Sequence, residues 1–151
     1  MADIVSNPKA RRDYHILETL EAGIVLRGTE VKSLRAGKGQ IRDAYAQVEN
    51  GQVFLYNAHI DEYAQGNRQN HEPKAVRKLL LHKREIQKLF GLAEVKGRAL
   101  VPLAFYWKNG KVKVALAVGQ GKAQFDKRAA LQRREADREL KRATMRRFKG
   151  R

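Results

Sequence analysis

Residues 99–118 read ALVPLAFYWKNGKVKVALAV. The first nine residues are apolar or aromatic, and from Val112 to Val118 an apolar residue then occupies every second position. A period of two is typical of a strand with one buried face. Asn109-Gly110 separates the two runs, and Asn-Gly is the strongest short-range signal for a two-residue hairpin turn. This segment therefore predicts two antiparallel strands joined by a tight turn.

The same signal occurs earlier in the chain. Small and apolar residues alternate with polar ones from Ala44 to Val48, and a second apolar run extends from Val53 to Tyr56. Asn50-Gly51 lies between them, so a second hairpin is predicted.

The remaining elements are shorter. Apolar patterning predicts strands over Tyr14–Leu20 and Ile24–Leu26, separated by a bend at Gly23, and another over Val76–Leu81. A short helix is predicted from a Thr29 cap to Gly37, and a second from Lys83 to Leu92 with its end at Gly91. Residues 61–75 are polar and predict a long loop.

Six or seven short strands with two short helices in their connections indicate a mainly β fold, a small closed β-barrel. A basic barrel interrupted by helices has the profile of an OB-fold, with SH3-like barrels and other small Greek keys as alternatives. Three parts are predicted: a loosely held basic arm over residues 1–12, the barrel over 13–119, and a basic C-terminal tail over 120–151.

The C-terminal tail carries 12 Lys or Arg against 4 Asp or Glu, which is +8 of the chain's net +16. Its composition favours a helix, because Ala, Leu, Arg, Lys, Glu and Gln dominate from Lys127 onward. Arg134, Arg138 and Arg142 are spaced four apart and repel one another on such a helix. A polyanion resolves this conflict, so the tail is predicted to become helical on a partner; a solubilising tail without a specific target is the alternative.

The charge of the whole chain makes nucleic acid the leading partner, because phosphates release counterions when Lys and Arg neutralise them. Anionic membrane is a weaker alternative, since the tail lacks the large apolar face of an interfacial helix. The absence of cysteine excludes disulfides, thiol catalysis and cysteine-ligated zinc. No signal-peptide or membrane-spanning run is present, so a soluble cytoplasmic protein is predicted.

One group of residues has the composition of a catalytic or metal site: His59, Asp61, Glu62, His71 and Glu72. Their spacing matches no established metal signature, and most of them fall in the predicted loop. We therefore predict no catalytic site, no metal and no cofactor. Among the aromatic residues, Phe125 lies in the basic tail outside any predicted core, so it is predicted to stack on a nucleic-acid base.

Four segments resemble one known family. They are GTEVKSLRAGK (28–38), NRQNHEPKAVRKLLLHKREI (67–86), YWKNGKVKV (106–114) and GKAQFDKR (121–128). In this order they closely resemble the SmpB family, the tmRNA-binding (SsrA-binding) proteins of bacterial trans-translation, over about Asn7 to Arg147.

The resemblance implies an OB-type barrel that binds the tRNA-like domain of tmRNA and delivers it to stalled ribosomes for ribosome rescue. It implies tmRNA-binding roles for five surface positions: Asn7, Glu21, Leu80, His82 and Lys111. An acidic residue fits an RNA face if its carboxylate accepts from a base amino group or a 2′-hydroxyl.

For the tail, the resemblance implies entry into the decoding centre of the small subunit through Gly121, Lys122, Phe125, Asp126, Lys127 and Arg128. The following helix would lie in the empty mRNA channel with Arg133, Arg134, Arg138, Lys141 and Arg142. The predicted protein is a monomeric, non-enzymatic adaptor. A general OB-fold RNA chaperone or ribosome accessory protein is the alternative, and an RNA-processing enzyme using His59, Asp61 and His71 is a third hypothesis.

Overall fold

Both predicted hairpins are present, and their turns have the backbone that Asn-Gly favours. Asn50 and Gly51 have φ of 52° and 74°, and Asn109 and Gly110 have φ of 53° and 74°. Two successive residues with positive φ match the twist of the strands that they join. The first turn connects β4 (Tyr45–Glu49) to β5 (Gln52–Tyr56), and the second connects β8 (Arg98–Lys108) to β9 (Lys111–Gly121).

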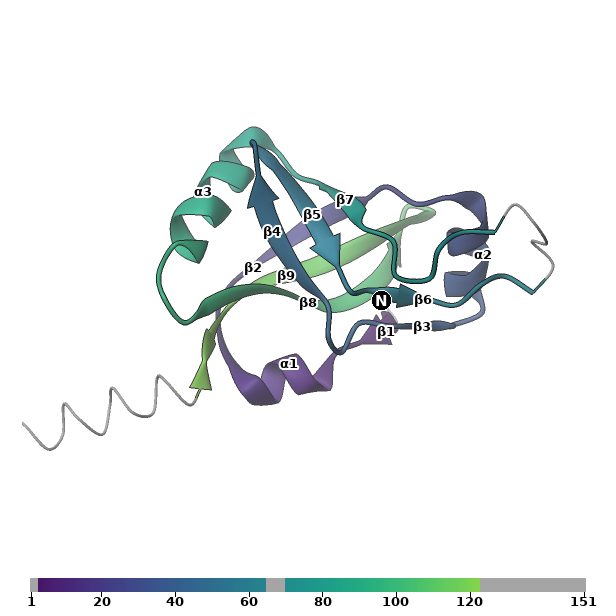
Figure 1. Ribbon diagram of the computed structural model, residues 1–151, viewed down its shortest axis with the longest axis horizontal. Coiled ribbons are helices and arrows are strands. Elements are labelled where there is room, and N and C mark those ends of the chain that lie inside the picture. Colours follow the sequence, from purple (N-terminus) through teal and green to yellow (C-terminus); the bar gives the residue numbers. More distant parts are fainter. Residues whose placement is uncertain (1–2, 65–69, 123–151) are drawn as a thin grey trace, which may run out of the picture.

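The computed structural model describes residues 3–64 and 70–122. The other described elements are β1 (Asp3–Ser6), α1 (Pro8–Asp13), β2 (Tyr14–Ile24), α2 (Gly28–Arg35), β3 (Gly39–Gln40), β6 (His59–Ile60), β7 (Arg77–Leu80) and α3 (Lys83–Ala93). Figure 1 shows the strands wrapped around one another, with α3 over one end and α2 beside the other. The fold is mainly β.

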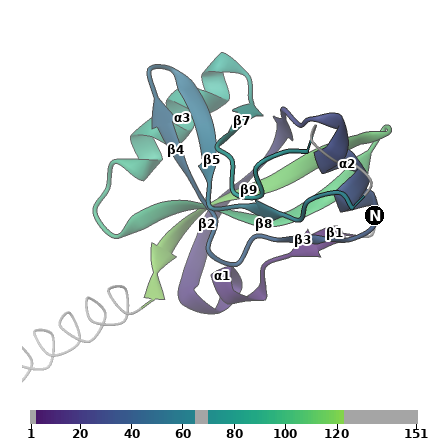
Figure 2. The same cartoon turned by 45° about the vertical axis from the view of Figure 1, so that its right-hand side comes forward.

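The main sheet has the order β1-β8-β4-β5-β7-β2-β9, and β9 also pairs with β8. Its hydrogen-bonded pairings therefore form a ring of six strands that begins and ends at β8. Neighbouring strands of this ring are antiparallel. The short strands β3 and β6 pair separately. Figure 2 shows β3 beside β1.

The core lies inside this ring of strands. Val53, Leu55, Phe105, Val114 and Leu116 are fully buried, and along β5 the buried residues alternate with more exposed ones. Leu89 of α3 adds a buried side chain where that helix packs on β4, β8 and β9. The period-two pattern thus identified the inward face of β5, but along β8 and β9 the residues 100–105 and 116–120 are buried without interruption, because Ala10 of α1 covers Val101, Leu103 and Ala117 on the other face.

The N-terminal arm differs from the prediction. Its described part is not loosely held, because β1 pairs with β8 and Ala10 of α1 is buried against Val101, Leu103 and Ala117. Pro8 occupies the first turn of α1, where its missing N–H has no helical partner to lose. The number of helices among the described residues is therefore three and not two.

Three boundaries also differ from the prediction. The segment from Tyr14 to Ile24 is one strand with a bulge between Ile16 and Glu18, and the expected bend at Gly23 is absent. Helix α3 continues through Gly91 to Ala93. Helix α2 begins at Gly28, and the Glu30 side chain accepts from the Arg27 N–H at 2.8 Å, so Thr29 is not the cap.

Candidate nucleic-acid interface

Three of the predicted RNA-binding residues, Glu21, Leu80 and Lys111, lie on neighbouring strands of the main sheet. Glu21 points outward from β2, two residues before Gly23, which pairs with Leu80 of β7 on one side and with Lys113 of β9 on the other. Leu80 and Lys111 line the same shallow hollow of about 270 Å³, together with Trp107 and Lys113. Antiparallel pairing across β7, β2 and β9 therefore brings residues far apart in sequence onto one face, here called the Glu21 face.

Gly23 lets the three strands present side chains at close range. A Cβ atom at Gly23 would lie 3.2 Å from the Cβ of Leu80 and 3.7 Å from the Lys113 Nζ. Leu80 is 50% exposed. An exposed apolar side chain beside lysines offers contact to a base or ribose together with contact to phosphate.

Glu21 is held in its charged form by two neighbours from β8. The Tyr106 hydroxyl donates to its Oε2 at 2.5 Å, and the Lys108 Nζ lies 3.1 Å from Oε1. The hydrogen bond from Tyr106, followed by that from Lys108, lowers the pKa of Glu21 below 4.5. The carboxylate is thus ionised at neutral pH and remains partly open to solvent.

The same hydrogen bond lowers the pKa of Glu21 and raises the pKa of Tyr106. Burial, followed by the hydrogen bond to Glu21, raises the pKa of Tyr106 to about 12. The phenol is therefore a hydrogen-bond donor over the whole physiological pH range.

The sequence missed Tyr106, Lys108 and Lys113 as parts of this face. Tyr106 and Lys108 alternate with Phe105 and Trp107, which pack on the core, so the period of two already placed them outside. The pattern does not give the strand order, which places Tyr106 and Lys108 next to Glu21. Arg35 of α2 also reaches this region, with its guanidinium carbon 5.7 Å from the centre of the Trp107 ring.

Asn7 is not a surface residue, contrary to the prediction. Its side chain is buried, its Nδ2 donates to the carbonyl oxygens of Ile41 (3.0 Å) and Pro102 (2.9 Å), and its Oδ1 accepts from the Ala10 N–H. These bonds tie the start of α1 to β8 and to the segment that follows β3. Asn7 is also absent from the lining of the hollow beside Leu80.

The other predicted residues are placed as follows. His82 is exposed just before α3, two residues beyond Leu80, and its backbone N–H donates to Glu85 Oε1 at 3.0 Å. Gly121 pairs with Tyr14 and donates its N–H to the Gly97 carbonyl at 2.9 Å, and Lys122 follows it. Nine tail residues lie outside the described ranges: Phe125, Asp126, Lys127, Arg128, Arg133, Arg134, Arg138, Lys141 and Arg142. The predicted tail helix lies outside those ranges as well.

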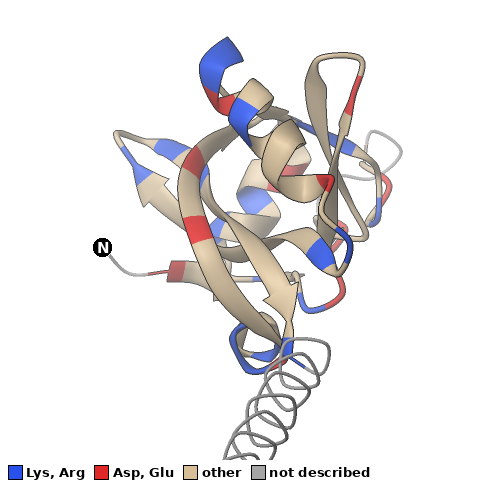
Figure 3. Ribbon diagram, turned by 90° about the vertical axis from the view of Figure 1, so that its left-hand side faces the viewer, with Lys and Arg blue, Asp and Glu red and all other residues tan. Residues whose placement is uncertain are grey.

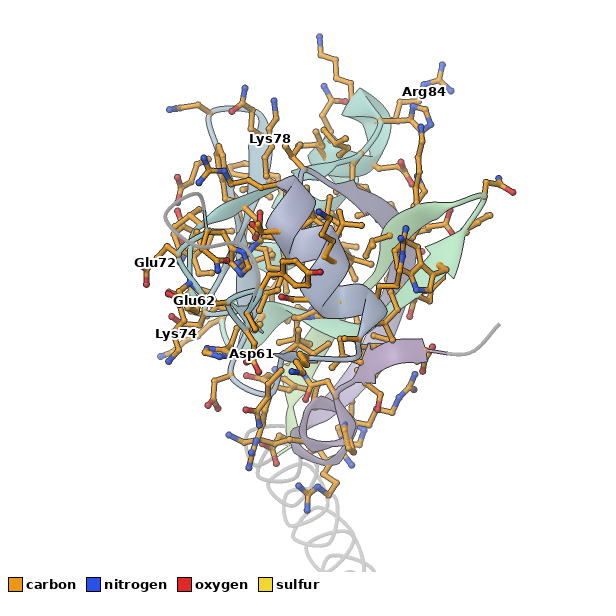
Figure 4. All side chains as sticks on the ribbon, turned by 90° about the vertical axis from the view of Figure 1, so that its right-hand side faces the viewer. Asp61, Glu62, Glu72, Lys74, Lys78 and Arg84 are labelled. Atoms are coloured by element: carbon orange, nitrogen blue, oxygen red, sulfur yellow. The ribbon has the colours of Figure 1, made fainter. Side chains whose placement is uncertain are left out.

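The residues considered for catalysis do not form one site. Figure 4 shows Asp61, Glu62 and Glu72 on one side of the molecule, and all three are exposed. Asp61 pairs with His59 at 2.8 Å. His71 is buried instead, with its Nε2 donating to the Ile60 carbonyl (2.9 Å) and its Nδ1 2.8 Å from the Thr29 hydroxyl. Within residues 3–64 and 70–122, no three His, Asp or Glu side chains are grouped as metal ligands.

A buried ion pair braces the loop that leads into β7. Arg77 and Glu30 are each 3% exposed and form a salt bridge between β7 and α2. The remaining Arg77 nitrogens donate to the carbonyl oxygens of Ala58 (2.6 Å), Pro73 (3.0 Å) and Glu72. The pair fixes the start of the strand that carries Leu80.

In the described part of the chain no helix is long and apolar enough to span a membrane.

The sequence of the chain is similar to those of known proteins. The family described as "SmpB protein" matches residues 4–146. The chain belongs to the SmpB family. An SsrA-binding protein of Geobacillus sp. (strain WCH70) is 59% identical over 140 residues, covering 93% of this chain and 90% of that protein. Another, from Acidothermus cellulolyticus, is 57% identical over 147 residues and covers 97% and 92% of the two chains.

The SmpB family likeness extends to three dimensions. A solved structure described as "tmRNA-SmpB: a journey to the center of the bacterial ribosome" superimposes with a TM-score of 0.69 at 49% identity. The match covers 80% of this chain and 85% of that one. At this identity, the likeness concerns both the sequence and the fold.

Proposed function

We propose that this chain is a non-enzymatic adaptor of trans-translation, which binds the tRNA-like domain of tmRNA and delivers it to stalled ribosomes. Membership of the SmpB family supports this function, because its curated relatives are SsrA-binding proteins. The meeting of Glu21, Leu80 and Lys111 on one face is the structural observation that carries it.

Each part of the Glu21 face has a distinct task in this proposal. The ionised Glu21 accepts hydrogen bonds from a base amino group or a 2′-hydroxyl, which are donors that a phosphate cannot supply. Lys111 and Lys113 contact phosphates, and Leu80 covers a base or ribose. His82 is close in sequence to Leu80 and adds a polar contact at the edge.

The tail performs a second task. Its excess of eight positive charges suits the phosphate-lined mRNA channel, which is open only when a ribosome has no message in it. Phe125 stacks on a base of the decoding centre. Asp126, Lys127 and Arg128 orient the tail where it enters that centre. Specificity for stalled ribosomes then follows from competition with mRNA. The tail leaves from Gly121, beside Tyr14, at the opposite end of β9 from Lys111.

The proposal also covers the fold: the ring of six strands is an OB-type barrel. The protein acts in the cytoplasm, and it acts as a monomer. Basic residues occur on several separate parts of the described body, including α1, α3 and the β8–β9 hairpin (Figure 3). This spread favours an alternative, a general RNA chaperone, which would bind many RNAs with similar affinity.

The test is selective binding by the full chain. Affinity for the tRNA-like fragment of tmRNA is compared with affinity for an unrelated RNA hairpin of equal length at the same salt concentration. Glu21→Gln should weaken binding to the fragment but not to the hairpin. Glu18→Gln is the matched control, because Glu18 is another carboxylate of β2 and pairs with Lys88. Equal affinity for the two RNAs, or equal effects of the two variants, would reject the adaptor in favour of the chaperone.

A separate measurement tests the tail. A chain ended after Lys122 keeps β9 complete. It should bind the tRNA-like fragment but fail to support peptide tagging on ribosomes that carry truncated mRNA. If fragment binding is lost as well, the tail is a general RNA clamp and the division of tasks proposed here is wrong.

A further inference from the structure

The last strand, β9, is held tightly up to its final residues. Residues 116–120 are all buried, and Gly121 and Lys122 are half-buried. The ends of a folded unit usually loosen unless specific contacts hold them. We call residues 116–122 the tail root, because the basic tail leaves the body from this segment. The contacts that hold the tail root therefore determine where the tail starts.

Helix α1 covers the tail root from outside the barrel. Leu116 and Val118 belong to the main core, whereas Ala117 packs with Ala10 of α1 in a second apolar cluster. Figures 1 and 2 both show α1 beside the end of β9. A segment with buried apolar contacts on both faces opens locally much less than an exposed strand end.

The Tyr14 side chain lies directly on the tail root. Gly119 has no side chain, and a Cβ atom there would lie 2.8 Å from the Cβ and 2.9 Å from the Cγ of Tyr14. Tyr14 also pairs with Gly121 in the sheet. One residue, at the junction of α1 and β2, thus contacts the backbone of the last residues before the tail.

Hydrogen bonds hold the tail root from the side of β8. The Gly121 N–H donates to the Gly97 carbonyl at 2.9 Å, and the Arg98 Nε donates to the Gln120 Oε1 at 3.3 Å. The Arg98 Nη1 also donates to the Leu92 carbonyl at 3.3 Å, which connects the same guanidinium to the end of α3. The tail root is therefore fixed both by α1 and by the connection from α3 to β8.

Strand β9 joins the tail root to the Glu21 face. Lys111 is the first residue of this 11-residue strand, and Gly121 is the last. An antiparallel strand of this length spans roughly 34 Å, at about 3.4 Å per residue. β9 pairs with β8 from Lys111 to Gln120, so the two ends of β9 are fixed relative to one another.

We propose that Tyr14 and helix α1 are positioning elements for the tail: they hold the tail root so that the tail starts at a fixed place relative to the RNA on the Glu21 face. This inference rests on the proposed function and adds to it that the tail is not attached flexibly. A flexible attachment spreads the tail over a large volume and lowers its effective concentration at one target. A rigid start limits that loss, because fewer orientations are given up when the tail enters the channel.

The first experiment compares Tyr14→Ala with Tyr14→Phe in the full chain. Phenylalanine keeps a ring over Gly119, and alanine removes it. NMR relaxation gives the order parameter of the Gly121 amide, which is about 0.85 for a rigid backbone and below about 0.6 for a flexible one. We expect Gly121 to be rigid in the unaltered chain and in Tyr14→Phe, and flexible in Tyr14→Ala.

The functional readouts should separate in the same way. Peptide tagging on ribosomes that carry truncated mRNA should fall about tenfold or more in Tyr14→Ala and not in Tyr14→Phe, because a misplaced group loses the benefit of fixed orientation. Affinity for the tRNA-like fragment should stay within about twofold in both variants, since distant sites act independently and the Glu21 face lies at the other end of β9.

A loss of stability alone would not produce this pattern, and Val53→Ala is the control for it. Val53 is fully buried in β5, so its truncation lowers the free energy of unfolding through a cavity away from the tail root. The control should leave Gly121 rigid and tagging intact. Equal losses of tagging in Val53→Ala and Tyr14→Ala, or a rigid Gly121 in Tyr14→Ala, would overturn the proposal.

A second variant leaves every described contact in place. A spacer of Gly-Ser repeats between Lys122 and Ala123 makes the attachment flexible, and the same spacer added after Arg151 is its control. The internal spacer should reduce tagging as Tyr14→Ala does, and the terminal spacer should not. Full tagging with the internal spacer would overturn the proposal.

The chain ended after Lys122 distinguishes the two possible failures. If that chain still supports tagging, the tail has no role on the ribosome and the proposed function itself is wrong in this part. If that chain fails while the chain with the internal spacer tags fully, only the rigid start of the tail is rejected.

Discussion

The Tyr106 hydroxyl lies 2.5 Å from Oε2 of Glu21 and joins β8 to a carboxylate of β2 across the face that carries Leu80 and Lys111. A bare carboxylate at an RNA surface repels phosphates. A carboxylate held by a hydroxyl and by Lys108 has its charge partly balanced and its lone pairs oriented. The acidic residue is thereby compatible with a polyanionic partner.

Removal of the Tyr106 hydroxyl should raise the pKa of Glu21 toward 4.5, because the hydrogen bond from Tyr106 is the largest cause of the lowered pKa. The measurement is an NMR titration of the Glu21 carboxyl carbon in Tyr106→Phe. A group with a lowered pKa stabilises the folded state above its unfolded pKa, and that contribution is lost as pH falls through the folded value. The variant should therefore lose less stability than the unaltered chain below pH 4.5. An unchanged Glu21 titration would contradict the assigned cause.

At alkaline pH the titration of Tyr106 itself affects the free energy of unfolding. The pKa of Tyr106 is raised from 10.0 to about 12, so the folded state holds its phenolic proton more tightly than the unfolded chain does. The stability that this provides is complete below pH 10.0 and is lost as pH rises toward 12. Urea unfolding between pH 9 and 11 should show this decline in the unaltered chain, and a smaller decline in Tyr106→Phe. Equal slopes would exclude Tyr106 as the titrating group.

Arg77→Met should destabilise the protein by about 3–5 kcal/mol, because it leaves Glu30 charged and buried without its partner. The double variant Arg77→Met with Glu30→Gln should recover part of this loss, since the unpaired charge is removed. The free energies of unfolding of the two variants, measured in urea, give the comparison. Lys78→Met is the control at the exposed neighbouring position. A double variant that is no more stable than Arg77→Met would show that the lost carbonyl contacts dominate.

Asn7→Ala should lower the free energy of unfolding by about 1–3 kcal/mol, because buried groups of Ile41, Pro102 and Ala10 lose their partner. Affinity for the tRNA-like fragment should not change while the protein stays folded, since the Asn7 side chain is buried. Ser6→Ala, at an exposed neighbour, is the control. Weaker RNA binding at full stability would restore the direct contact that the sequence suggested for Asn7.

The sequence predicted what depends on local patterns. Asn50-Gly51 and Asn109-Gly110 identified both hairpins, and the alternation around them identified the buried face. It could not predict partners that are distant along the chain. The Arg77–Glu30 pair spans 47 positions and the Tyr106–Glu21 bond spans 85, and both depend on strand order. The N-terminal arm was misjudged for the same reason, because the contacts that hold it are distant along the chain: the pairing with β8, the buried Ala10 and the Asn7 hydrogen bonds to Ile41 and Pro102.

Leu80→Ala should separate recognition from stability. Leu80 is 50% exposed, so its truncation should change the free energy of unfolding by less than about 1 kcal/mol. Contact of the exposed part with a base or ribose is worth about 1 kcal/mol, and its loss should weaken binding of the tRNA-like fragment about fivefold. Val76→Ala is the matched control, because Val76 is 54% exposed just before the same strand. Equal affinities of the two variants for the fragment, measured by fluorescence anisotropy, would show that Leu80 does not touch RNA and would remove the apolar part of the proposed contact.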